Sequence, residues 1–576
     1  MPACSQFLIR GSLASVVGRP FRFSRGPTME AGHKPGRAIS DPASRSGRGR
    51  TQVALSAGVV GLVSAVNLFS LLRTPPPFID EVWFANRAWA LVTTGRNFGT
   101  MDSGVFDHFP GYWTYFPWWP SAFQGIGLRL FGLDLLGLRV VSLAFGLVLL
   151  AAVYATVRRL VGPAAALAAV FLVGLSRGFV YSAHLGRPDI MTAALGFGAV
   201  AAWSTVWPGP KFPVGSMVAG LLAALSVEFH PFGGLYVAVL GLALPVELAR
   251  RRAGLRALWA FGIGAGLGFG VYLGLHVLPY PETYTAINNL VALSSGAVRT
   301  PPIFTPDYRM WAQSVADMAT QFGSLWNLRI PLVIWGIILL ARSQNPAYRR
   351  LLTICVLLLA GYLGLIRNKN PWYGIMVSPA GDILAATSIA WLAGPGWAWL
   401  RYQARNTLRV PANPAAWESL RLLVLGGLLL VLTVPTLTRM ASNPLPDYRL
   451  IVGQLQRLAG PGDVVMGPAT YWLGIPDTRY ISWEQLIYYR RFRSIGPGEA
   501  MTALGVKYFI VDTYIDKFIT DNPRESVNAQ QLTVSRSELG LFLARHGAVV
   551  ARIETKTYGV TTVYRINSSD HEVSGR

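Results

Sequence analysis

Five short segments of the sequence carry ionisable residues beside apolar stretches. They are Asp80-Glu81, Asp107-His108, Arg187-Pro188-Asp189, Glu228-Phe229-His230-Pro231, and the stretch from Arg367 and Lys369 to Trp372-Tyr373. A carboxylate is suited to remove a proton from an acceptor hydroxyl. A cation nearby is suited to stabilise the charge that develops on a phosphate leaving group. Together these residue types would suit the transfer of a sugar from a lipid-linked phosphosugar to an acceptor.

Most of these segments also have a structural explanation, and the sequence leaves both open. Asp80 is a favourable N-cap for the helix expected after it, and Pro188-Asp189 is typical of a helix start. His230-Pro231 is also typical of a tight turn. Lys369 with Trp372-Tyr373 would suit an anchor at the membrane–water boundary. Asp382 falls deep inside an apolar stretch, where it is either paired within the membrane or facing an internal cavity.

The composition places these segments in a membrane protein. The chain has 576 residues, of which 52% are hydrophobic and 14% charged, and its mean hydropathy is +0.39. Ordinary soluble domains are about 25% charged, so a disordered protein, a coiled coil and an ordinary soluble enzyme are excluded. Stretches of about 20 apolar residues are long enough to cross the hydrocarbon core. The sequence predicts a polytopic α-helical membrane protein with about eleven spans, over residues 52–72, 138–160, 163–182, 189–207, 213–229, 231–248, 257–278, 328–341, 351–366, 371–395 and 420–438.

Basic residues predict the orientation of these spans. The net charge is +23, which in a soluble protein would raise the question of nucleic acid. Here the basic residues gather in alternate connections, as the positive-inside rule requires. The pattern places the N-terminus in the cytosol and everything after Arg439 outside. We therefore expect a multi-pass integral protein of the plasma (inner) membrane, with membrane lipids as partners and no nucleic-acid partner.

Changes in composition predict three parts. Residues 1–51 read as a disordered, basic cytosolic tail, with a transit peptide as the alternative. Residues 52–439 would form the transmembrane catalytic domain, with long exoplasmic loops at 73–137 and 279–327 and a helix over 80–93. Residues 440–576 alternate strand-length apolar runs with helical patterns, which predicts a small exoplasmic α/β domain. Its expected strands are 463–466, 479–481, 507–511, 549–553 and 560–566, and its expected helices are 448–458, 497–504 and 537–546.

These features resemble the GT-C glycosyltransferases that use polyprenyl-phosphate sugars, in particular glycosyltransferase family 39 with its protein-mannosyltransferase and aminoarabinose-transferase group. The residues that carry the resemblance are Asp80-Glu81 directly after the first span, Arg187-Pro188-Asp189 before an apolar helix, His230-Pro231, and Asn370-Pro371-Trp372-Tyr373 to Pro379. The many-span body with an exoplasmic C-terminal domain also fits. The resemblance covers roughly residues 50–400 in architecture.

The resemblance implies an inverting transfer at the outer face of the membrane. Asp80 would be the catalytic base that acts on the acceptor hydroxyl. Asp189 would be a second catalytic acid that orients the acceptor or partners cations. Arg187, Lys369 and His230 would face the lipid phosphate, and Glu81 would support the loop. The predicted substrate-binding set is completed by Asp107, His108, Trp372 and Tyr373.

One departure from the family pattern lies in the first loop. Relatives often carry an acid-Lys-Pro-Pro run there, whereas this chain reads Asp107-His108-Phe109-Pro110. Either His108 replaces the missing lysine or the donor is held differently. Some relatives hold a divalent metal at this site and others need none, so the cofactor stays unknown. Asp107 with His230 or His276 would offer the ligands for such a metal.

The sequence therefore predicts a membrane glycosyltransferase, hexosyl or pentosyl, with a polyprenyl-phosphate sugar as donor. The acceptor would be a hydroxyl of a cell-envelope lipid, glycan or protein, and protein O-mannosyltransfer is an alternative within the class. From other classes, a transporter or flippase of lipid-linked saccharides and an accessory protein without catalysis stay open. The lack of a detectable repeat favours the enzyme over the transporter. An enzyme of this kind requires the Asp80 and Asp189 carboxylates to share one cavity, about 10 Å apart or less.

Overall fold

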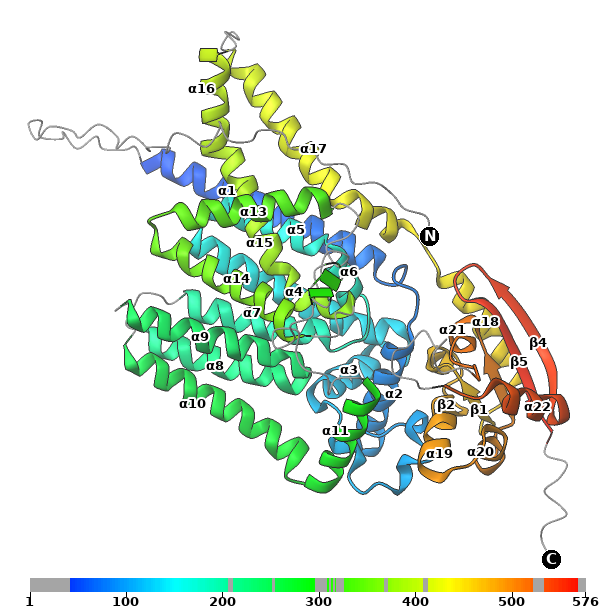
Figure 1. Cartoon of the computed structure of the whole chain (residues 1–576). Helices are drawn as coiled ribbons and strands as arrows, with labels where there is room; N and C mark the ends of the chain where they lie inside the picture. The colour runs from blue at the N-terminus through cyan, green and yellow to red at the C-terminus, as the bar shows by residue number, and fades with distance from the viewer. Residues whose placement is uncertain are drawn as a thin grey trace, which may run out of the picture. The chain divides into compact units, whose positions relative to one another are not determined.

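Helices make up most of the computed structural model of this chain, and the strands of the described residues form one sheet near the C-terminus (Figure 1). The structure describes residues 42–205, 211–250, 254–295, 308–309, 312–313, 316, 326–366, 371–407, 413–521 and 533–567. Residues 1–55 and 56–576 are two separate units. The contacts reported below lie within the second unit.

Each of the spans expected from the sequence falls on a helix. Seven helices of the described residues are long and apolar enough to cross a membrane, or eight when α5 and α6 count as one span bent by 61°. The expected count of about eleven and the orientation of the spans stay predictions. The helix bounds are α1 (Pro42–Ser70), α4 (Leu135–Leu160), α5 (Pro163–Gly174), α6 (Arg177–Ala183), α7 (Asp189–Thr205), α8 (Phe212–Phe229), α9 (Gly234–Ala249), α10 (Leu255–Tyr272), α13 (Trp326–Arg342), α14 (Pro346–Leu365), α15 (Ser378–Trp391), α16 (Trp397–Thr407) and α17 (Pro414–Ala441).

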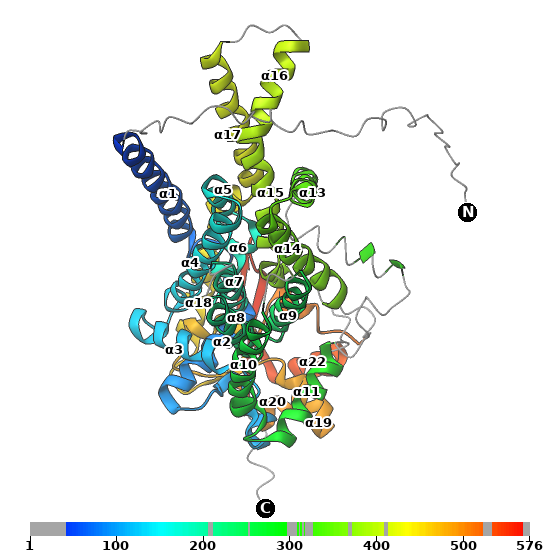
Figure 2. The same cartoon turned by 90° about the vertical axis from the view of Figure 1, so that its left-hand side faces the viewer.

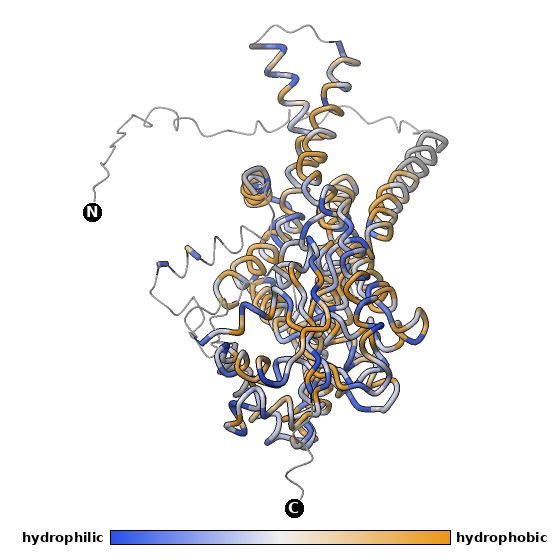
Figure 3. The backbone as a smooth tube through the Cα atoms, turned by 90° about the vertical axis from the view of Figure 1, so that its right-hand side faces the viewer, coloured by the Kyte–Doolittle hydropathy of each residue, from blue (hydrophilic) through white to orange (hydrophobic). Residues whose placement is uncertain are grey.

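Small residues let several of these helices approach closely. Helices α7, α8 and α10 lie in a row in which α8 contacts both neighbours (Figures 1 and 2). A Cβ atom at Gly220 would collide with the backbone oxygen of Phe261, and one at Gly264 would collide with that of Met217. Close backbone contact through small residues is the usual way in which helices associate in lipid. Figure 3 shows the hydropathy along α16 and α17. Apolar residues run along α17, whereas the ends of α16 and α17 that are joined to each other are polar.

The first long loop contains two further helices, α2 (Ile79–Thr94) and α3 (Trp118–Phe131). The helix expected over residues 80–93 is confirmed as α2, which buries Val82 and Ala85. The first turn of α3 is capped from a distance, since Glu228 Oε1 accepts the backbone N–H of Trp118 at 2.6 Å. A carboxylate is favoured at a helix N-terminus because free N–H groups and the helix dipole point toward it. The cap ties the first loop to the end of α8.

The residues from Leu445 to Ile566, here called the α/β region, form a five-stranded sheet in the order β2-β1-β3-β5-β4. The strand β1 is parallel to β2 and β3, whereas β5 is antiparallel to β3 and β4. The five strands and three helices expected here are confirmed to within a few residues, but α19 and α21 were not expected. The bounds are α18 (Leu445–Leu458), β1 (Val464–Gly467), β2 (Arg479–Ser482), α19 (Gln485–Arg493), α20 (Pro497–Ala503), β3 (Tyr508–Val511), α21 (Thr513–Asp516), α22 (Arg536–His546), β4 (Gly547–Thr555) and β5 (Gly559–Ile566).

The α/β region packs directly on the first long loop. Tyr558 donates its hydroxyl hydrogen to the backbone oxygen of Pro77 at 3.2 Å, just before α2. On the α19 side, the backbone N–H of Val105 donates to Gln485 Oε1 at 3.3 Å, and the Phe106 and Tyr488 rings lie 4.8 Å apart. These contacts fix the α/β region beside the start of α2. The predicted boundary of an exoplasmic domain at residue 440 stays a prediction.

Candidate functional site

Arg187 joins the two acids that the sequence singled out. Its Nε lies 2.7 Å from Asp189 Oδ2, and its Nη1 hydrogen-bonds to Asp80 Oδ2. Arg187 and Asp189 are buried, whereas 39% of the Asp80 side chain is exposed. Because one guanidinium contacts both carboxylates, the expected closeness of Asp80 and Asp189 is confirmed.

Two helix starts and one short connection create this arrangement. Asp80 lies in the first turn of α2, and Asp189 is the first residue of α7. Arg187 lies in the connection between α6 and α7, with Pro188 directly before the helix. An acid in the first turn of a helix is stabilised by the positive end of the helix dipole. The expected helix start at Pro188-Asp189 is confirmed, whereas the N-cap position expected for Asp80 is wrong, because Phe78 is the N-cap of α2 and Asp80 lies inside its first turn.

A second ion pair lies next to this cluster and holds its backbone. Glu81 contacts Arg139 at two points, 2.6 Å from Oε1 to Nη2 and 3.1 Å from Oε2 to Nε. Glu81 Oε2 also accepts the backbone N–H of Gly186 at 3.0 Å, one residue before Arg187. Glu81 is buried. Because it binds the backbone next to Arg187 and directly follows Asp80 in the chain, Glu81 positions these two residues relative to each other.

Aromatic side chains cover one side of Arg187. The guanidinium lies 5.7 Å from the centre of the Trp372 ring, and Trp372 packs against Phe78 and Tyr181 with ring centroids 4.8 and 5.7 Å apart. Tyr373 interacts electrostatically with the Arg187 side chain. The structure therefore brings Trp372 and Tyr373 to the cluster, as the sequence predicted.

His230 lies against Tyr373, with ring centroids 5.0 Å apart. Its Nδ1 accepts the backbone N–H of Phe232 at 3.2 Å, so that the proton of the neutral ring belongs on Nε2. Burial lowers the pKa of His230 to about 4, with Asp189 opposing and Arg187 adding to the shift. At neutral pH His230 is thus an uncharged N–H donor at the edge of the cluster.

The charges of the cluster do not cancel. Desolvation lowers the pKa of Arg187, whereas the negative charges of Asp189 and Asp80 raise it. The upward effects are together larger, so the net shift of the pKa is upward and the guanidinium stays charged. One cation therefore faces two acids. Asp189 Oδ1 is buried and has no hydrogen-bond partner among the described residues. Such an oxygen is an acceptor that a ligand or a water molecule would satisfy.

A metal ion does not fit between these acids. In the part of the chain that the structure describes, no group of three or more His, Cys, Asp or Glu side chains converges as metal ligands would. The place between the Asp80 and Asp189 carboxylates is taken by the Arg187 guanidinium. His276, named as a ligand from the sequence, instead contacts Glu228 at 3.4 Å and the backbone oxygen of Thr114 at 2.5 Å.

The other predicted site residues lie elsewhere or outside the described structure. Asp107 is exposed and accepts the backbone N–H of Gly104 at 2.8 Å, within a turn of the first loop. The side chain of His108 and the whole of Lys369 lie outside the described residues. Their predicted contact with a lipid phosphate stays a prediction.

Sequence reasoning missed two residues of the α/β region that face this cluster. Glu484 and Tyr514 both interact electrostatically with Asp80. Each follows a parallel strand, Glu484 two residues after β2 and Tyr514 three residues after β3. Ligands commonly bind at the carboxyl ends of parallel strands, and this rule, applied to the expected strands, would have found both.

Comparisons with known proteins support one fold. The sequence model of the dolichyl-phosphate-mannose-protein mannosyltransferase family matches residues 117–281, and no protein with a curated description matches the sequence. The solved structure of ArnT from Cupriavidus metallidurans bound to undecaprenyl phosphate is 14% identical, with a TM-score of 0.56 over 89% of this chain and 97% of that chain. The archaeal oligosaccharyltransferase AglB from Archaeoglobus fulgidus, in complex with an inhibitory peptide and a dolichol-phosphate, is 12% identical, with a TM-score of 0.50 over 90% of this chain and 75% of that chain.

At these identities the likeness concerns the fold, and it spans nearly the whole of ArnT. The apolar helices agree with it. The resemblance read from the sequence is thereby confirmed at this level: the chain is an integral membrane protein with the fold of the GT-C glycosyltransferases.

Proposed function

We propose that this protein transfers a sugar from a polyprenyl-phosphate donor to an acceptor hydroxyl, with Asp80 as the general base. The observation that carries the proposal is the half-exposed Asp80 carboxylate held by the buried Arg187, which is itself fixed by Asp189. A base must be accessible to its substrate and yet held in one orientation. The likeness in fold to a structure bound to undecaprenyl phosphate supports a lipid-phosphate donor.

The reaction is a single displacement with inversion at the anomeric carbon. Asp80 takes the proton of the acceptor hydroxyl as its oxygen attacks the anomeric carbon from the face opposite the phosphate. The new glycosidic C–O bond forms while the C–O bond to the phosphate breaks, and the polyprenyl phosphate leaves with the electron pair. His230, whose Nδ1 accepts the backbone N–H of Phe232, donates its Nε2–H to the negative charge that develops on the leaving phosphate.

Arg187 serves this reaction through the acids that it holds. It already donates to Asp189 and Asp80, so its role is to orient the Asp80 carboxylate and balance the charge of Asp189. The buried Asp189 Oδ1 accepts a hydrogen bond from the acceptor or from a water molecule that orients it. The reaction takes place at the exoplasmic face of the plasma (inner) membrane, with the N-terminus cytosolic and an envelope lipid, glycan or protein as acceptor.

The test is Asp80→Asn in membranes supplied with radiolabelled polyprenyl-phosphate sugars. Asparagine keeps the shape and the hydrogen bond to Arg187 but cannot take a proton, so transfer should fall by about 10²–10⁴-fold while the labelled donor still binds. Glu418→Gln, which changes an exposed acid on α17, should transfer like the wild type. Wild-type protein that moves the labelled lipid across the bilayer without any acceptor, or an Asp80→Asn variant with full transfer, would overturn the proposal.

A further inference from the structure

We propose that the carboxyl edge of the parallel strands in the α/β region forms the acceptor-binding wall of the Asp80 site, and that Glu484 and Tyr514 bind a neutral, polyhydroxylated acceptor there. This inference rests on the proposed function, because it names the class of acceptor whose hydroxyl Asp80 would activate. It also assigns a task to the α/β region.

The topology of the sheet brings this edge to the start of α2. Strands β1, β2 and β3 are parallel, and the segments that follow their carboxyl ends include Tyr471, Glu484 and Tyr514. Tyr471 lies in one hydrophobic cluster with Ile79 and Val82 of α2. The turn between β4 and β5 reaches the same place, since Tyr558 in this turn donates to the backbone oxygen of Pro77. The carboxyl edge therefore lies beside the turn that holds Asp80.

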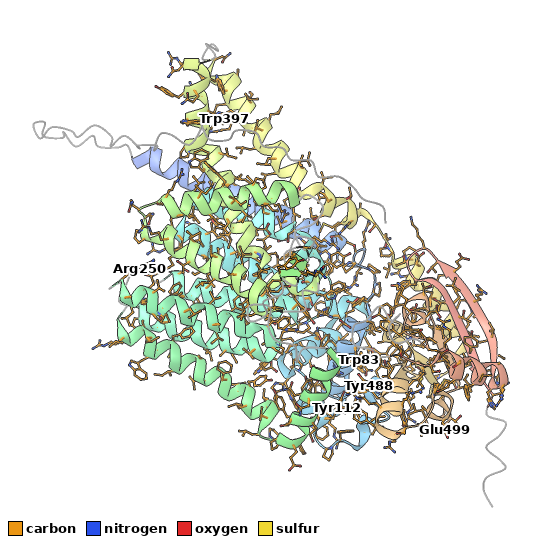
Figure 4. The ribbon with its side chains drawn as sticks, in the orientation of Figure 1. Trp83, Tyr112, Arg250, Trp397, Tyr488 and Glu499 are labelled. Carbon is orange, nitrogen blue, oxygen red and sulfur yellow. The ribbon has the colours of Figure 1, made fainter. Side chains whose placement is uncertain are left out.

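A second set of contacts aligns α19 with α2. Asp102 lies between the two helices, where its carboxylate accepts from Arg87 at 2.8 Å and from Trp83 at 2.9 Å. Its backbone oxygen accepts from Gln485 at 3.4 Å. Trp83 follows Asp80 by three residues and so lies on the same face of α2. Figure 4 shows Trp83 and Tyr488 in the same part of the molecule. Glu484, the residue directly before α19, interacts electrostatically with both Asp80 and Asp102.

The carboxyl group of Glu484 is available for a ligand. Glu484 occupies the N-cap position of α19, where its side chain makes no capping hydrogen bond. In the described part of the chain the backbone of Glu484 is hydrogen-bonded, but its carboxyl oxygens take part in no hydrogen bond or ion pair. The carboxyl group can therefore bind an acceptor without giving up a contact to the protein.

The charges around Glu484 determine its protonation. Burial first, and then Asp80 and Asp102, raise the pKa of Glu484 to about 8, with Arg87 opposing. Glu484 is therefore mostly protonated at neutral pH and can donate a hydrogen bond next to the accepting Asp80 carboxylate. The charged and titratable groups that face it are Asp80 and Arg87 on α2, Asp102 in the first loop, Tyr112 in the same loop, Tyr488 on α19 and Tyr514 on α21.

This pairing of a donor and an acceptor fits two neighbouring hydroxyls of a sugar. One hydroxyl would donate to Asp80 while the oxygen of the next accepts the proton of Glu484. Tyr514 adds a ring that is 40% exposed, and an exposed ring beside polar groups is suited to the apolar face of a pyranose or furanose. Arg87 and Arg187 are already paired with acids, so an acceptor that carries phosphate would meet unbalanced negative charge next to Asp80. The wall therefore favours a neutral glycan over a phosphorylated acceptor.

The test measures acceptor binding to the full chain in lipid nanodiscs. The acceptors are a panel of neutral octyl disaccharides built from mannose, arabinose or glucose, and binding is detected by the change in intrinsic fluorescence. Wild-type protein should bind a member of this panel at pH 7 and bind it about 10-fold more weakly at pH 9, where Glu484 is ionised. Glu484→Ala should bind it about 10-fold more weakly at both pH values. Glu484→Gln keeps a neutral donor, so it should bind equally at pH 7 and pH 9.

The control is Glu538→Gln, which changes an exposed acid of α22 in the same α/β region and should behave like the wild type. The inference would be overturned if Glu484→Ala bound like the wild type, if the pH dependence survived in Glu484→Gln, or if no panel member bound. Tighter binding of a phosphorylated octyl disaccharide or of an octyl amino-disaccharide would also overturn it. The thermal unfolding temperature of each variant identifies a loss of fold. Acceptor binding is measured without a donor, so the inference about Glu484 can be supported even when the proposed Asp80-dependent transfer is not observed. Conversely, transfer can depend on Asp80 even when the Glu484 variants bind the acceptor like the wild type.

Discussion

Glu81 and Arg139 form a two-point ion pair from which solvent is fully excluded, with 2.6 Å between Glu81 Oε1 and Arg139 Nη2. Replacing Glu81 by Gln would leave the buried Arg139 charge without its partner. We expect the free energy of unfolding to fall by about 3–5 kcal/mol. Transfer per folded molecule should also fall, because Glu81 fixes the backbone of Gly186 next to Arg187. Thermal unfolding in detergent and transfer activity measure the two effects.

The matched control for this prediction removes both charges. The Glu81→Gln/Arg139→Gln double variant has no uncompensated buried charge and should recover part of the lost stability. It should not recover transfer, since the contact of Glu81 with the Gly186 backbone is still changed. A Glu81→Gln variant as stable as the wild type would show that the pair contributes little.

Arg187→Lys tests whether one side chain must hold both acids. A lysine ammonium is a single point donor and cannot reproduce the fork that contacts Asp189 through Nε and Asp80 through Nη1. The Asp80 carboxylate would then be misplaced, and a misplacement of about 1 Å can cost about 10²-fold in rate. We expect kcat for sugar transfer to fall by about that factor while donor binding stays near the wild-type value. Full kcat in Arg187→Lys would mean that the fork is not needed.

His230 should act as a neutral donor throughout the physiological range. Its pKa in the folded protein is about 4, below the value of about 6.5 for an unperturbed histidine. Between these pH values the unfolded chain binds more protons, so stability decreases as the pH falls from about 6.5 toward 4. This part of the pH dependence should be smaller in His230→Asn, as measured by unfolding temperatures at several pH values. A transfer profile that breaks near pH 6.5 in the wild type and not in His230→Asn would contradict the neutral assignment.

The order of elements was predictable from sequence because their patterns are local. The strands over 464–467, 479–482 and 508–511 fell where apolar runs of strand length predicted them, since alternation of short runs and turns depends on neighbouring residues alone. The helix α19 was missed because its sequence, QLIYYRRFR, is short, and because Glu484 before it makes no capping hydrogen bond.

The candidate site was predictable in part for a related reason. Asp80, Arg187, Asp189, Trp372 and Tyr373 converge, because each lies beside the end of a predicted apolar span. The contribution of Glu484 was not visible, since it depends on how the α/β region docks on α2. The partner of Glu81 was also hidden, because Arg139 occurs within an apolar span and nothing in the local sequence links it to residue 81.

Asp382 is paired with Arg329 within the protein, one of the two arrangements that the sequence left open. Its Oδ1 lies 2.6 Å from Arg329 Nη1, and both side chains are buried between α13 and α15. Arg329 also donates to the backbone oxygen of Leu432 on α17 at 3.4 Å, so that the pair links three helices. Asp382→Asn should lower the unfolding temperature strongly, since it leaves the buried guanidinium uncompensated at a cost of about 3–5 kcal/mol. The Arg329→Met/Asp382→Leu double variant replaces the pair by apolar side chains and should unfold near the wild-type temperature, with transfer per folded molecule unchanged. A double variant that is folded and yet inactive would instead assign this pair to the reaction, because its stability would then be intact and only a chemical or binding role would remain lost.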